Sequence, residues 1–359
     1  MPTALLVSKP IAPPWTDSNK NLVRDLARAF VRYRPRVMVP AGSPLDRVES
    51  VGIYQGRGAY APSRAANARV LAYLLLGSRA DLWHFFFAPN PLTLRAGAMA
   101  ARVRRVPTVH TLASAPDNLE AIAQHLFADA VVVLSTHTQV RLAAVGVAST
   151  VIAPALAPVE VSPEAVARAR VRHGLPSRYA LYAGDLEHSN GAETFLEAAV
   201  RAPELGWVVA ARPKTARAAE ALMRLRDRAR TLGVDLRLLG ELDDILAVVA
   251  GATVNTLVVD TLHAKMDYPL VLLEAMRLGV PVVVGKGTAA EALTAGGAVA
   301  VASGDAAGLA EAARSITDDA ALRERLGAEG QAWVAAHCDP AAVAEAYEAV
   351  YDRVLAGPR

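Results

Sequence analysis

The stretch that decides the fold runs from residue 254 to residue 284. It reads VNTLVVD (254–260), KMDYPLVLLEAMRLG (265–279) and VPVVV (280–284). Its two ends are apolar and rich in β-branched residues, as expected of strands that are buried on both faces of a parallel sheet. Residues 270–278 are apolar on nearly every side and predict a buried helix, with Pro269 at its first turn and Gly279 at its end. The order strand, loop, helix, strand therefore predicts an α/β fold.

One carboxylate, Glu274, lies inside this apolar helix. Burying a lone carboxylate is costly unless it accepts hydrogen bonds. Glu274 is therefore either satisfied within the protein or accepts hydrogen bonds from the hydroxyls of a ligand. Because the preceding loop also carries Lys265 and Asp267, we favour the ligand.

The sequence PLVLLEAMRLGVPVVV (269–284) resembles the signature helix of retaining glycosyltransferases of the B-type fold, especially glycosyltransferase family 4. That family usually carries two glutamates separated by seven residues. Glu274 matches the second, and Met266 stands in the place of the first. The resemblance implies two Rossmann-like domains that face a cleft. It also implies a nucleotide-sugar donor, transfer of the sugar with retention, and binding of the ribose hydroxyls by Glu274.

Length and composition set the broad class of the protein. The 359 residues are enough for two domains, and 53% hydrophobic against 20% charged residues indicates a globular chain. No apolar run has the length of a membrane span, the N-terminus has no secretion signal, and the single Cys338 cannot form an internal disulfide. We therefore expect a cytoplasmic protein.

Charge is distributed unevenly along the chain. Residues 1–155 hold 17 Lys and Arg against 8 Asp and Glu, a net charge of +9, whereas residues 156–359 hold 21 against 27, a net charge of −6. This asymmetry favours an anionic partner for the first half, with a merely solvated basic surface as the alternative. We expect the basic face of a helix at residues 22–31 to contact the inner face of an anionic membrane. No nucleic-acid-binding module is recognised, so we expect no nucleic acid partner.

The first half begins with a βαβ unit, in which strands at residues 4–7 and 36–39 flank the helix at residues 22–31. Further strands are predicted at residues 82–87, 108–112, 131–134 and 150–152, and residues 41–68 have no clear assignment. Open α/β sheets bind ligands at the carboxyl ends of their strands. We therefore place the acceptor side, for a glycan, lipid or small-molecule acceptor, at these residues: Trp15, Asp17, Asn19, Lys20 and His110. Family 4 often carries a histidine at the position that Ala113 holds here.

A Pro-rich stretch at residues 154–163 predicts a linker. We expect an N-terminal domain at residues 1–160, a nucleotide-sugar-binding domain at residues 161–338, and a C-terminal helix at residues 339–359 that packs back on the first domain. Strands of the second domain are predicted at residues 180–183, 207–211, 236–239, 254–259, 282–284 and 298–301.

The donor site departs from the family pattern in its first turn. That turn usually carries two cations that hold the donor diphosphate, and Asp185 and Asn190 take their places here. Gly184 would let a ligand approach the backbone. Other cations follow a strand or precede the signature helix, whose start near Leu270 favours an anion. The predicted donor-binding residues are Glu274, Lys265, Arg212, Lys214, Gly184, Leu242 and Leu270.

Two alternatives stay open. The motif G-x-G-x-x-A at residues 285–290, with Asp305 beyond it, is compatible with a nicotinamide oxidoreductase, although it lies late in its domain. The changes at Asp185, Asn190 and Met266 also fit a sugar-nucleotide-binding protein that has lost activity. The chain contains no Asp-x-Asp, so we expect no metal, and no cofactor apart from the nucleotide-sugar substrate.

Overall fold

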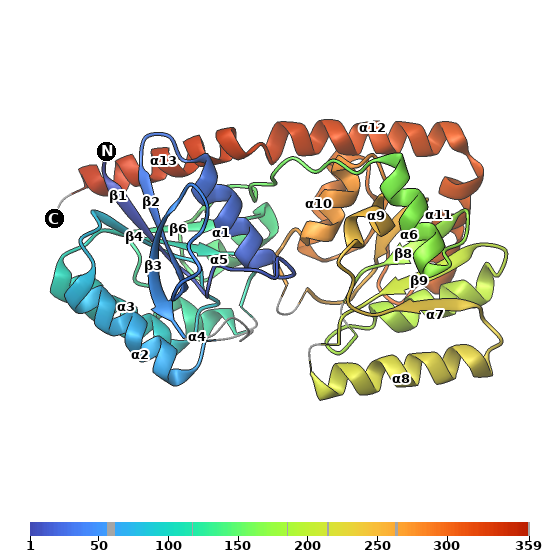
Figure 1. The fold of residues 1–359 in the computed structure, drawn as a ribbon, viewed down its shortest axis with the longest axis horizontal. Coiled ribbons are helices and arrows are strands. Elements are labelled where there is room, and N and C mark those ends of the chain that lie inside the picture. The colour runs from blue at the N-terminus through green and yellow to red at the C-terminus, as the bar shows by residue number, and fades with distance from the viewer. Residues whose placement is uncertain (56–61, 117, 185, 214, 263–264, 358–359) are drawn as a thin grey trace. The chain divides into compact units, whose positions relative to one another are not determined.

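The computed structural model describes residues 1–55, 62–116, 118–184, 186–213, 215–262 and 265–357. The chain forms two compact units, each with its own parallel sheet (Figure 1). The first unit comprises Met1–Ala157, Ala264–Asp267 and His337–Arg359, and the second comprises Pro158–His263 and Tyr268–Ala336. The fold is therefore α/β with two Rossmann-like units, as predicted, and the C-terminal helix belongs to the first.

The sheet of the first unit has, in the described part of the chain, seven strands in the order β3-β2-β1-β4-β5-β6-β7. All neighbouring pairs are parallel. The strand order reverses between β1 and β4, which is where an open α/β sheet binds ligands at its carboxyl edge. The strands are β1 (Thr3–Val7), β2 (Arg34–Pro40), β3 (Glu49–Tyr54), β4 (Leu82–Phe85), β5 (Thr108–Leu112), β6 (Ala130–Val133) and β7 (Thr150–Val151).

The six strands predicted for this unit are all present, with ends that differ by at most two residues. The seventh, β3, lies in the stretch that the sequence left unassigned. Among the described strands it pairs with β2 alone, and it has an exposed Gly52 in its interior, so it lacks the continuous apolar run of a central strand.

The helices of the first unit are α1 (Ser18–Ala29), α2 (Arg64–Ala72), α3 (Pro91–Arg104), α4 (Leu119–Ala123), α5 (Thr136–Ala144) and α13 (Pro340–Ala356), with a π-helical turn η1 (Tyr73–Gly77) after α2. Helix α1 starts earlier than predicted because the Asp17 carboxylate caps it, accepting from the backbone N–H groups of Asn19 (3.0 Å) and Lys20 (3.2 Å). The helix ends at Ala29, two residues before its predicted end at residue 31. Val31 is 72% exposed.

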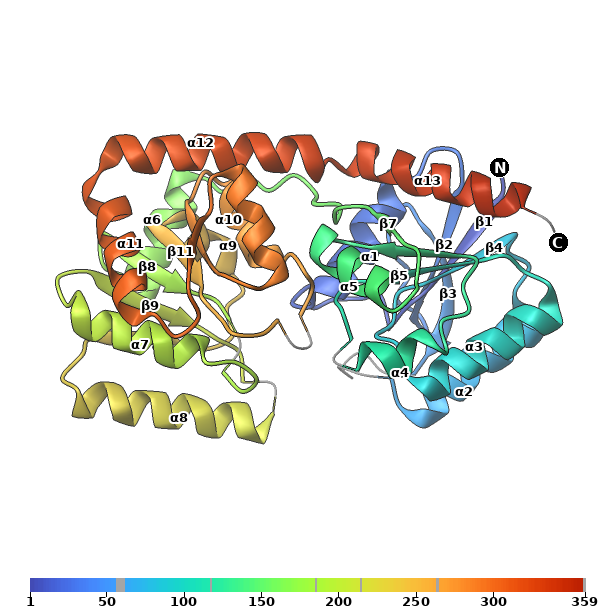
Figure 2. The ribbon, with the colours of Figure 1, turned by 180° about the vertical axis from the view of Figure 1, so that it is seen from behind.

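Helix α13 packs against α1 and β5 and runs across the first unit (Figures 1 and 2). Its Glu348 is 3% exposed, and one carboxylate oxygen accepts from the backbone N–H groups of Val31 (2.8 Å), Arg32 (2.6 Å) and Tyr33 (3.3 Å). The other oxygen accepts from Nε of Arg32 at 3.1 Å. A single carboxylate thus fixes the turn between α1 and β2 to the last helix.

A buried polar network also joins α13 to the sheet. Nδ1 of His84 lies 2.6 Å from the hydroxyl of Tyr351, and Nε2 lies 2.7 Å from Oγ1 of Thr111. Oγ1 of Thr111 in turn lies 3.1 Å from the hydroxyl of Tyr347. Because these four residues are fully or almost fully buried, the contacts satisfy polar groups that would otherwise destabilise the core. Helix α13 is therefore an integral part of the first unit.

The sheet of the second unit has six strands in the described part of the chain, in the order β10-β9-β8-β11-β12-β13, again all parallel. They are β8 (Tyr179–Tyr182), β9 (Gly206–Ala210), β10 (Leu236–Leu239), β11 (Val254–Leu257), β12 (Val282–Gly285) and β13 (Val299–Val301). All six were predicted, with ends that differ by at most two residues. The order reverses between β8 and β11, so this unit has the same kind of switch point as the first.

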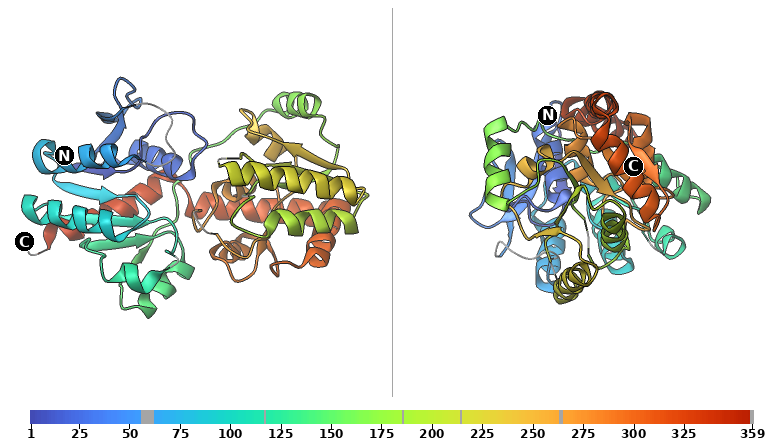
Figure 3. Two further views of the ribbon diagram at one scale, coloured as in Figure 1. Left: turned by 90° about the horizontal axis from the view of Figure 1, so that it is seen from below. Right: turned by 90° about the vertical axis from the view of Figure 1, so that its right-hand side faces the viewer.

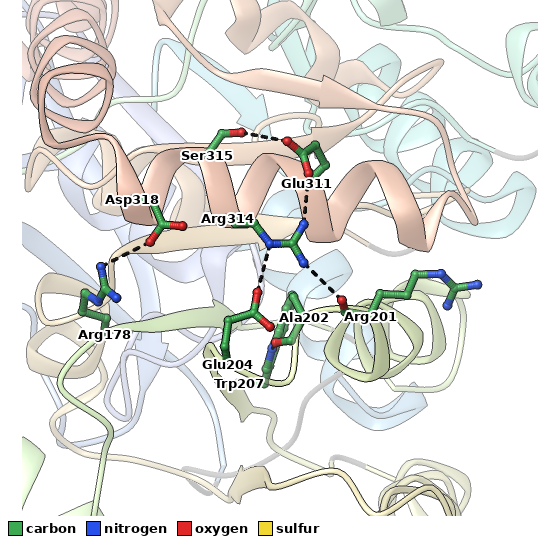
Figure 4. A network of polar contacts seen from close by, with 9 residues as sticks. All are labelled: Arg178, Arg201, Ala202, Glu204, Trp207, Glu311, Arg314, Ser315 and Asp318. Carbon is green, nitrogen blue, oxygen red and sulfur yellow. Dashed lines mark hydrogen bonds and ion pairs between the residues drawn. The ribbon is translucent and has the colours of Figure 1, made fainter.

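The helices of the second unit are α6 (Pro163–His173), α7 (Gly191–Arg201), α8 (Ala216–Thr231), α9 (Ile245–Ala250), α10 (Leu270–Arg277), α11 (Ala306–Asp318) and α12 (Ala320–His337), with a 3₁₀ helix η2 (Ala289–Gly296). Helices α7 and α8 lie side by side (Figures 1 and 3). Helix α11 is fixed to the turn before β9 by Arg314, which donates to Glu204 (2.9 Å), Glu311 (3.0 Å) and the carbonyl oxygen of Arg201 (3.1 Å) (Figure 4). Among the described residues, none of the helices combines the length and the apolar character needed to cross a bilayer.

The stretch that opened the sequence analysis folds as β11, α10 and β12. Pro269 occupies the N-cap of α10 rather than its first turn, and Gly279 follows the helix with a φ of +74°, a conformation that favours glycine. Nδ2 of the buried Asn255 donates to the carbonyl oxygen of Val271 at 3.2 Å, which fixes α10 to the centre of the sheet. This helix begins on the carboxyl side of β11, where ligands of parallel sheets bind.

Candidate donor and acceptor sites

Glu274 is the fifth residue of α10, in its second turn, and is half-buried. Its neighbours on the helix are apolar, and Leu270, Leu273 and Ala275 are 5%, 0% and 0% exposed. A half-buried carboxylate on such a helix retains access for a ligand while most of its surroundings exclude water. In this setting a hydrogen bond from a ligand hydroxyl is stronger than in bulk water.

The turn after β8 is held by Asn190, one of the two replaced cation positions. Its backbone N–H donates to the carboxylate of Asp260 (3.1 Å), and its side-chain oxygen accepts from the backbone N–H of Asp260 (3.1 Å). Its Nδ2 donates to Oγ of Ser303 at 3.0 Å. Asn190 therefore joins the carboxyl ends of β8, β11 and β13. The other replaced position, Asp185, lies outside the described residues.

Gly184 has a packing role in the structure. A Cβ added there would lie 2.4 Å from Cζ of Tyr182 and 2.6 Å from its hydroxyl oxygen. A glycine is thus required here because the ring of Tyr182 lies over the backbone, whether or not a ligand also approaches it.

The predicted cations of the donor site have different surroundings. Nη1 of Arg212 donates to Glu241 at 3.0 Å, just beyond the ends of β9 and β10. Lys265 is half-buried and belongs to the first unit, whereas Arg212 and Glu274 belong to the second. Lys214 lies outside the described residues.

The turn after β10 carries the half-buried Leu242. Asp244, which follows it, accepts from Nε2 of His173 at 2.9 Å and so joins α9 to α6. Among the described residues, no group of three or more potential ligands is arranged to hold a metal ion.

On the acceptor side, the residues of the loop before α1 contact one another and the sheet. The carboxylate that caps α1, Asp17, also accepts from Nζ of Lys9 at 2.7 Å. Nδ2 of Asn19 donates to the carbonyl oxygen of Phe86, just beyond β4, at 3.0 Å. Trp15 is half-buried, and the guanidinium of Arg24 lies 4.7 Å from its ring centre. This loop therefore lies at the switch point of the first sheet.

The basic face predicted for residues 22–31 is not a free surface. Lys20 is 7% exposed and donates to the carbonyl oxygen of Ala12 at 3.2 Å, and Arg24 pairs with Asp25 at 2.6 Å. Arg32 lies beyond the helix and pairs with Glu348 and Asp352. Arg28, in the last turn of α1, is exposed, so the contact of this face with an anionic membrane stays a prediction.

His110 is 0% exposed, and its ring packs against Phe85 and Phe87. Its Nε2 lies 3.0 Å from the carbonyl oxygen of Phe87. Burial lowers the pKa of His110 to about 4, so the ring is neutral near pH 7. His110 supports the carboxyl edge of the first sheet from within the core.

The loop before α10 makes a contact within the first unit that the sequence did not predict. The backbone N–H of Asp267 donates to the carbonyl oxygen of Ala113 at 2.8 Å, and its carboxylate accepts from Oγ of Ser135 at 2.6 Å. Asp267 is 3% exposed, and burial raises the pKa of its carboxyl group. Met266 beside it is 4% exposed. The positions that hold a histidine and a glutamate in family 4, Ala113 and Met266, thus lie next to each other along this contact.

The motif at residues 285–290 does not form a dinucleotide-binding turn. It leads into the 3₁₀ helix η2 and not into the α-helix whose N-terminus would bind a pyrophosphate. A Cβ at Gly285 would lie 2.4 Å from the carbonyl oxygen of Val259, and the side chain of Asp305 caps α11 by accepting from Gly308 N–H at 2.8 Å. These residues serve local packing and capping.

Comparisons with known proteins agree with this architecture. Residues 177–319 match the family model described as glycosyl transferases group 1. No curated protein sequence is significantly similar to the chain.

Several solved structures share the fold over almost the whole chain. Anabaena HepE in complex with UDP and glucose has a TM-score of 0.79 at 17% identity, covering 98% of this chain and 99% of HepE. Sucrose-phosphate synthase from Thermosynechococcus elongatus has a TM-score of 0.76 at 19% identity, covering 99% and 100%. The UDP-forming α,α-trehalose-phosphate synthase from Burkholderia xenovorans, in complex with glucose-6-phosphate, has a TM-score of 0.74 at 13% identity, covering 98% and 99%. At these identities the likeness concerns the fold. The chain therefore has the B-type glycosyltransferase fold, and the second of its two units contains a region similar to group 1 glycosyl transferases at residues 177–319.

Proposed function

We propose that the protein is a retaining glycosyltransferase that moves a sugar from a nucleotide-sugar to an acceptor hydroxyl without a metal ion. The observation that carries the proposal is the half-buried Glu274 on the apolar helix α10, inside the region that matches group 1 glycosyl transferases. The structural neighbour HepE was solved with UDP and with UDP-glucose, so a uridine nucleotide is the first donor to test.

In this reaction the bond between the sugar and the diphosphate breaks, and the diphosphate gains negative charge. The acceptor oxygen forms the new bond and loses its proton. Cations and backbone N–H groups that are held in place before the reaction stabilise this developing charge. We assign this role to Lys265 and Arg212, together with the start of α10 at Leu270, and we assign the ribose hydroxyls to Glu274.

The donor role of Glu274 is tested by titration calorimetry with UDP. Glu274→Ala should weaken binding by about 1.5–3 kcal/mol, the range for a hydrogen bond to a charged group, which is about 10- to 150-fold in Kd. Glu220→Ala is the matched control, because Glu220 is an exposed carboxylate on α8. Unchanged affinity of the folded Glu274→Ala variant would exclude the ribose role.

The phosphate role of Lys265 is tested by comparing UDP with uridine. Lys265→Met should lower the affinity for UDP by about 10- to 150-fold, because a charge-assisted contact is lost, and should barely change the affinity for uridine. Equal losses for the two ligands would mean that Lys265 supports the loop and that other groups hold the phosphates.

A second candidate is a sugar-nucleotide-binding protein without transferase activity. Met266, where family 4 has a glutamate, is buried and carries no hydrogen-bonding group, and the neighbouring Asp267 is engaged with Ser135. UDP release from UDP-sugars, measured with and without a panel of acceptors, separates the two candidates. Binding without release in every mixture supports the binding protein. Release, with a product whose anomeric configuration matches that of the donor by NMR, supports the retaining transferase.

A further inference from the structure

Helix α3 is apolar on two opposite faces. Its inner face packs into the first unit, where Leu94, Ala100 and Ala101 are 0%, 0% and 9% exposed. On its outer face Leu92, Met99 and Val103 are 77%, 48% and 66% exposed. Residues separated by seven and then four positions lie on one side of a helix, so these three side chains form a stripe that faces solvent. Surface helices usually present polar groups on that side, and an apolar stripe indicates a partner.

Arginines flank this stripe. Arg95 follows Leu92 by three positions and Arg102 follows Met99 by three, so both lie along one side of the stripe. Both are exposed, and neither forms an ion pair with any residue that the structure describes. Arg105, at the end of the helix, is exposed as well. The outer face of α3 therefore combines apolar side chains with uncompensated positive charge.

The excess of arginine over acidic residues extends along the sequence on both sides of α3. Residues 50–116 contain eight arginines and a single acidic residue, Asp81. The carboxylate of Asp81 accepts from the backbone N–H of Thr3 at 2.7 Å, so it is engaged at the start of β1. Most of the net charge of +9 in the first half of the chain thus belongs to this segment.

Helix α8 of the second unit shows the opposite arrangement. It also carries several arginines, but Arg228 pairs with Glu193 and Glu197 of α7, and Arg224 and Arg230 each lie 3.9 Å from a carboxylate of their own helix. Three of the five arginines of α8, namely Arg224, Arg228 and Arg230, therefore have acidic partners, whereas those beside the α3 stripe have none among the described residues. This difference argues that the charge on α3 is available to an external anion.

The turn η1, which lies beside α3, carries a further exposed apolar side chain. Leu76 in this turn is 85% exposed. Nη1 of Arg104 donates to the carbonyl oxygen of Leu75 at 2.7 Å, and Nη2 donates to that of Ser78 at 2.9 Å. These bonds fix η1 to the end of α3, so Leu76 keeps a fixed position relative to the stripe.

We propose that the outer face of α3, together with Leu76, docks on an anionic lipid bilayer. Aliphatic side chains gain free energy by entering the boundary between headgroups and acyl chains, while the flanking guanidinium groups pair with anionic headgroups. A nucleic acid would use the arginines but would offer little to exposed Leu and Met side chains. A second copy of this face would bring its arginines together. The surface lies wholly within the first unit, and the proposal does not depend on the glycosyltransferase function.

Co-sedimentation of the full chain with vesicles tests this assignment. The protein should bind vesicles of phosphatidylcholine that contain about 30% phosphatidylglycerol and should be released as salt rises from ~0.1 to ~0.5 M. Each arginine contributes about fivefold near such a surface, so the pair Arg95→Gln and Arg102→Gln should weaken binding by about 30-fold. Leu92→Ser with Met99→Ser should weaken it by about tenfold or more at unchanged charge.

The matched control is the pair Arg224→Gln and Arg230→Gln on α8, which removes the same charge and should change binding by less than about twofold. All four substituted positions of the α3 variants are exposed, so their thermal midpoints should equal that of the parent protein. Equal binding to pure phosphatidylcholine, or equal losses in the α3 and α8 arginine pairs, would overturn the proposal. So would a concentration-dependent dimer that Leu92→Ser with Met99→Ser abolishes, which would assign the face to a second copy. Binding of a single-stranded oligonucleotide in place of vesicles would assign it to nucleic acid.

Discussion

Removing the carboxylate of Glu348 should destabilise the first unit much more than removing any exposed carboxylate of the same helix. In Glu348→Ala the backbone N–H of the buried Tyr33 loses its acceptor, and so do those of Val31 and Arg32, which are partly accessible to water. A buried donor without a partner costs about 1–3 kcal/mol, and each partly solvated bond contributes about 0.5–1.5 kcal/mol. The pairing with Nε of Arg32 is lost as well. We expect a loss of about 2–5 kcal/mol in the free energy of unfolding.

Two further variants separate the charge from the geometry. Glu348→Gln keeps an acceptor oxygen of the same reach but removes the charge, so it should cost only about 1–2 kcal/mol. Glu345→Ala is the control. Glu345 lies on the same helix and is exposed, so its removal should change stability by less than about 0.5 kcal/mol.

Hydrogen exchange measured by mass spectrometry is the suitable assay, because a chain with two units need not unfold in a single two-state transition. In Glu348→Ala the amides of residues 31–33 should exchange faster, and the strands of the first unit should lose protection in proportion to the loss of stability. The strands of the second unit should keep theirs. Equal exchange in Glu348→Ala and Glu345→Ala would refute the reasoning, and so would a loss of protection confined to the second unit.

Two other predictions concern the buried histidines and the glycine of the donor turn. Burial lowers the pKa of His84 well below 6.5 and that of His110 to about 4, so the unfolded chain binds these protons more readily. The contribution of the two histidines to the free energy of unfolding is fully present above pH ~6.5. It falls below that pH by about 1.4 kcal/mol per pH unit for each histidine. In urea titrations at pH 7 and pH 5, His110→Leu should therefore lose about half as much stability as the parent protein. Gly184→Ala should destabilise the second unit by about 1–3 kcal/mol because its Cβ would overlap the ring of Tyr182, whereas Gly240→Ala, whose Cβ would meet nothing within 4 Å, should be nearly neutral in the same thermal unfolding experiment.

The sequence predicts the sheets well because central strands of parallel sheets carry their own signal. Every residue of β11 and β12 is buried, and β12 begins with three valines, so these segments stand out against the amphipathic helices of the chain. β3 carries no such signal. It is an edge strand in which only the last two residues, Ile53 and Tyr54, are buried, and it exists because β2 offers it hydrogen-bonding partners. The end of α1 was misplaced for a related reason. Its last turn is decided by Glu348, more than 300 residues away, which accepts from the backbone N–H groups of residues 31–33 and so stops the helix.

The candidate site was harder to predict than the fold, because a side chain's type does not show which partner it has. Asp17 and Lys20 lie at the switch point of the first sheet, as the sequence indicated, but Asp17 caps α1, and Lys20 is in the first turn of α1 and binds a backbone carbonyl. Asn190 was recognised only as a missing cation. In the structure it joins the carboxyl ends of three strands through Asp260 and Ser303. The sequence gives one indication of this contact, which is that Asn190, Asp260 and Ser303 each follow a strand. Charge and spacing thus place a residue at the correct edge of the sheet, while its role depends on contacts between distant segments.

The loop before α10 shows how two departures from a family pattern can have one physical cause. Taken singly, Ala113 and Met266 look like independent losses of a histidine and a glutamate. The structure joins them, because the backbone of Asp267 binds the carbonyl oxygen of Ala113 and its carboxylate binds Ser135, with Met266 buried beside them. A carboxylate that is 3% exposed and already accepts a short hydrogen bond is poorly placed to take over the role of a glutamate at position 266. We therefore expect donor recognition in the proposed transferase to depend on Glu274 and on cations outside this contact. Ser135→Ala, which removes the partner of Asp267 and leaves Glu274 untouched, should lower the stability of the first unit and leave the affinity for UDP unchanged in titration calorimetry.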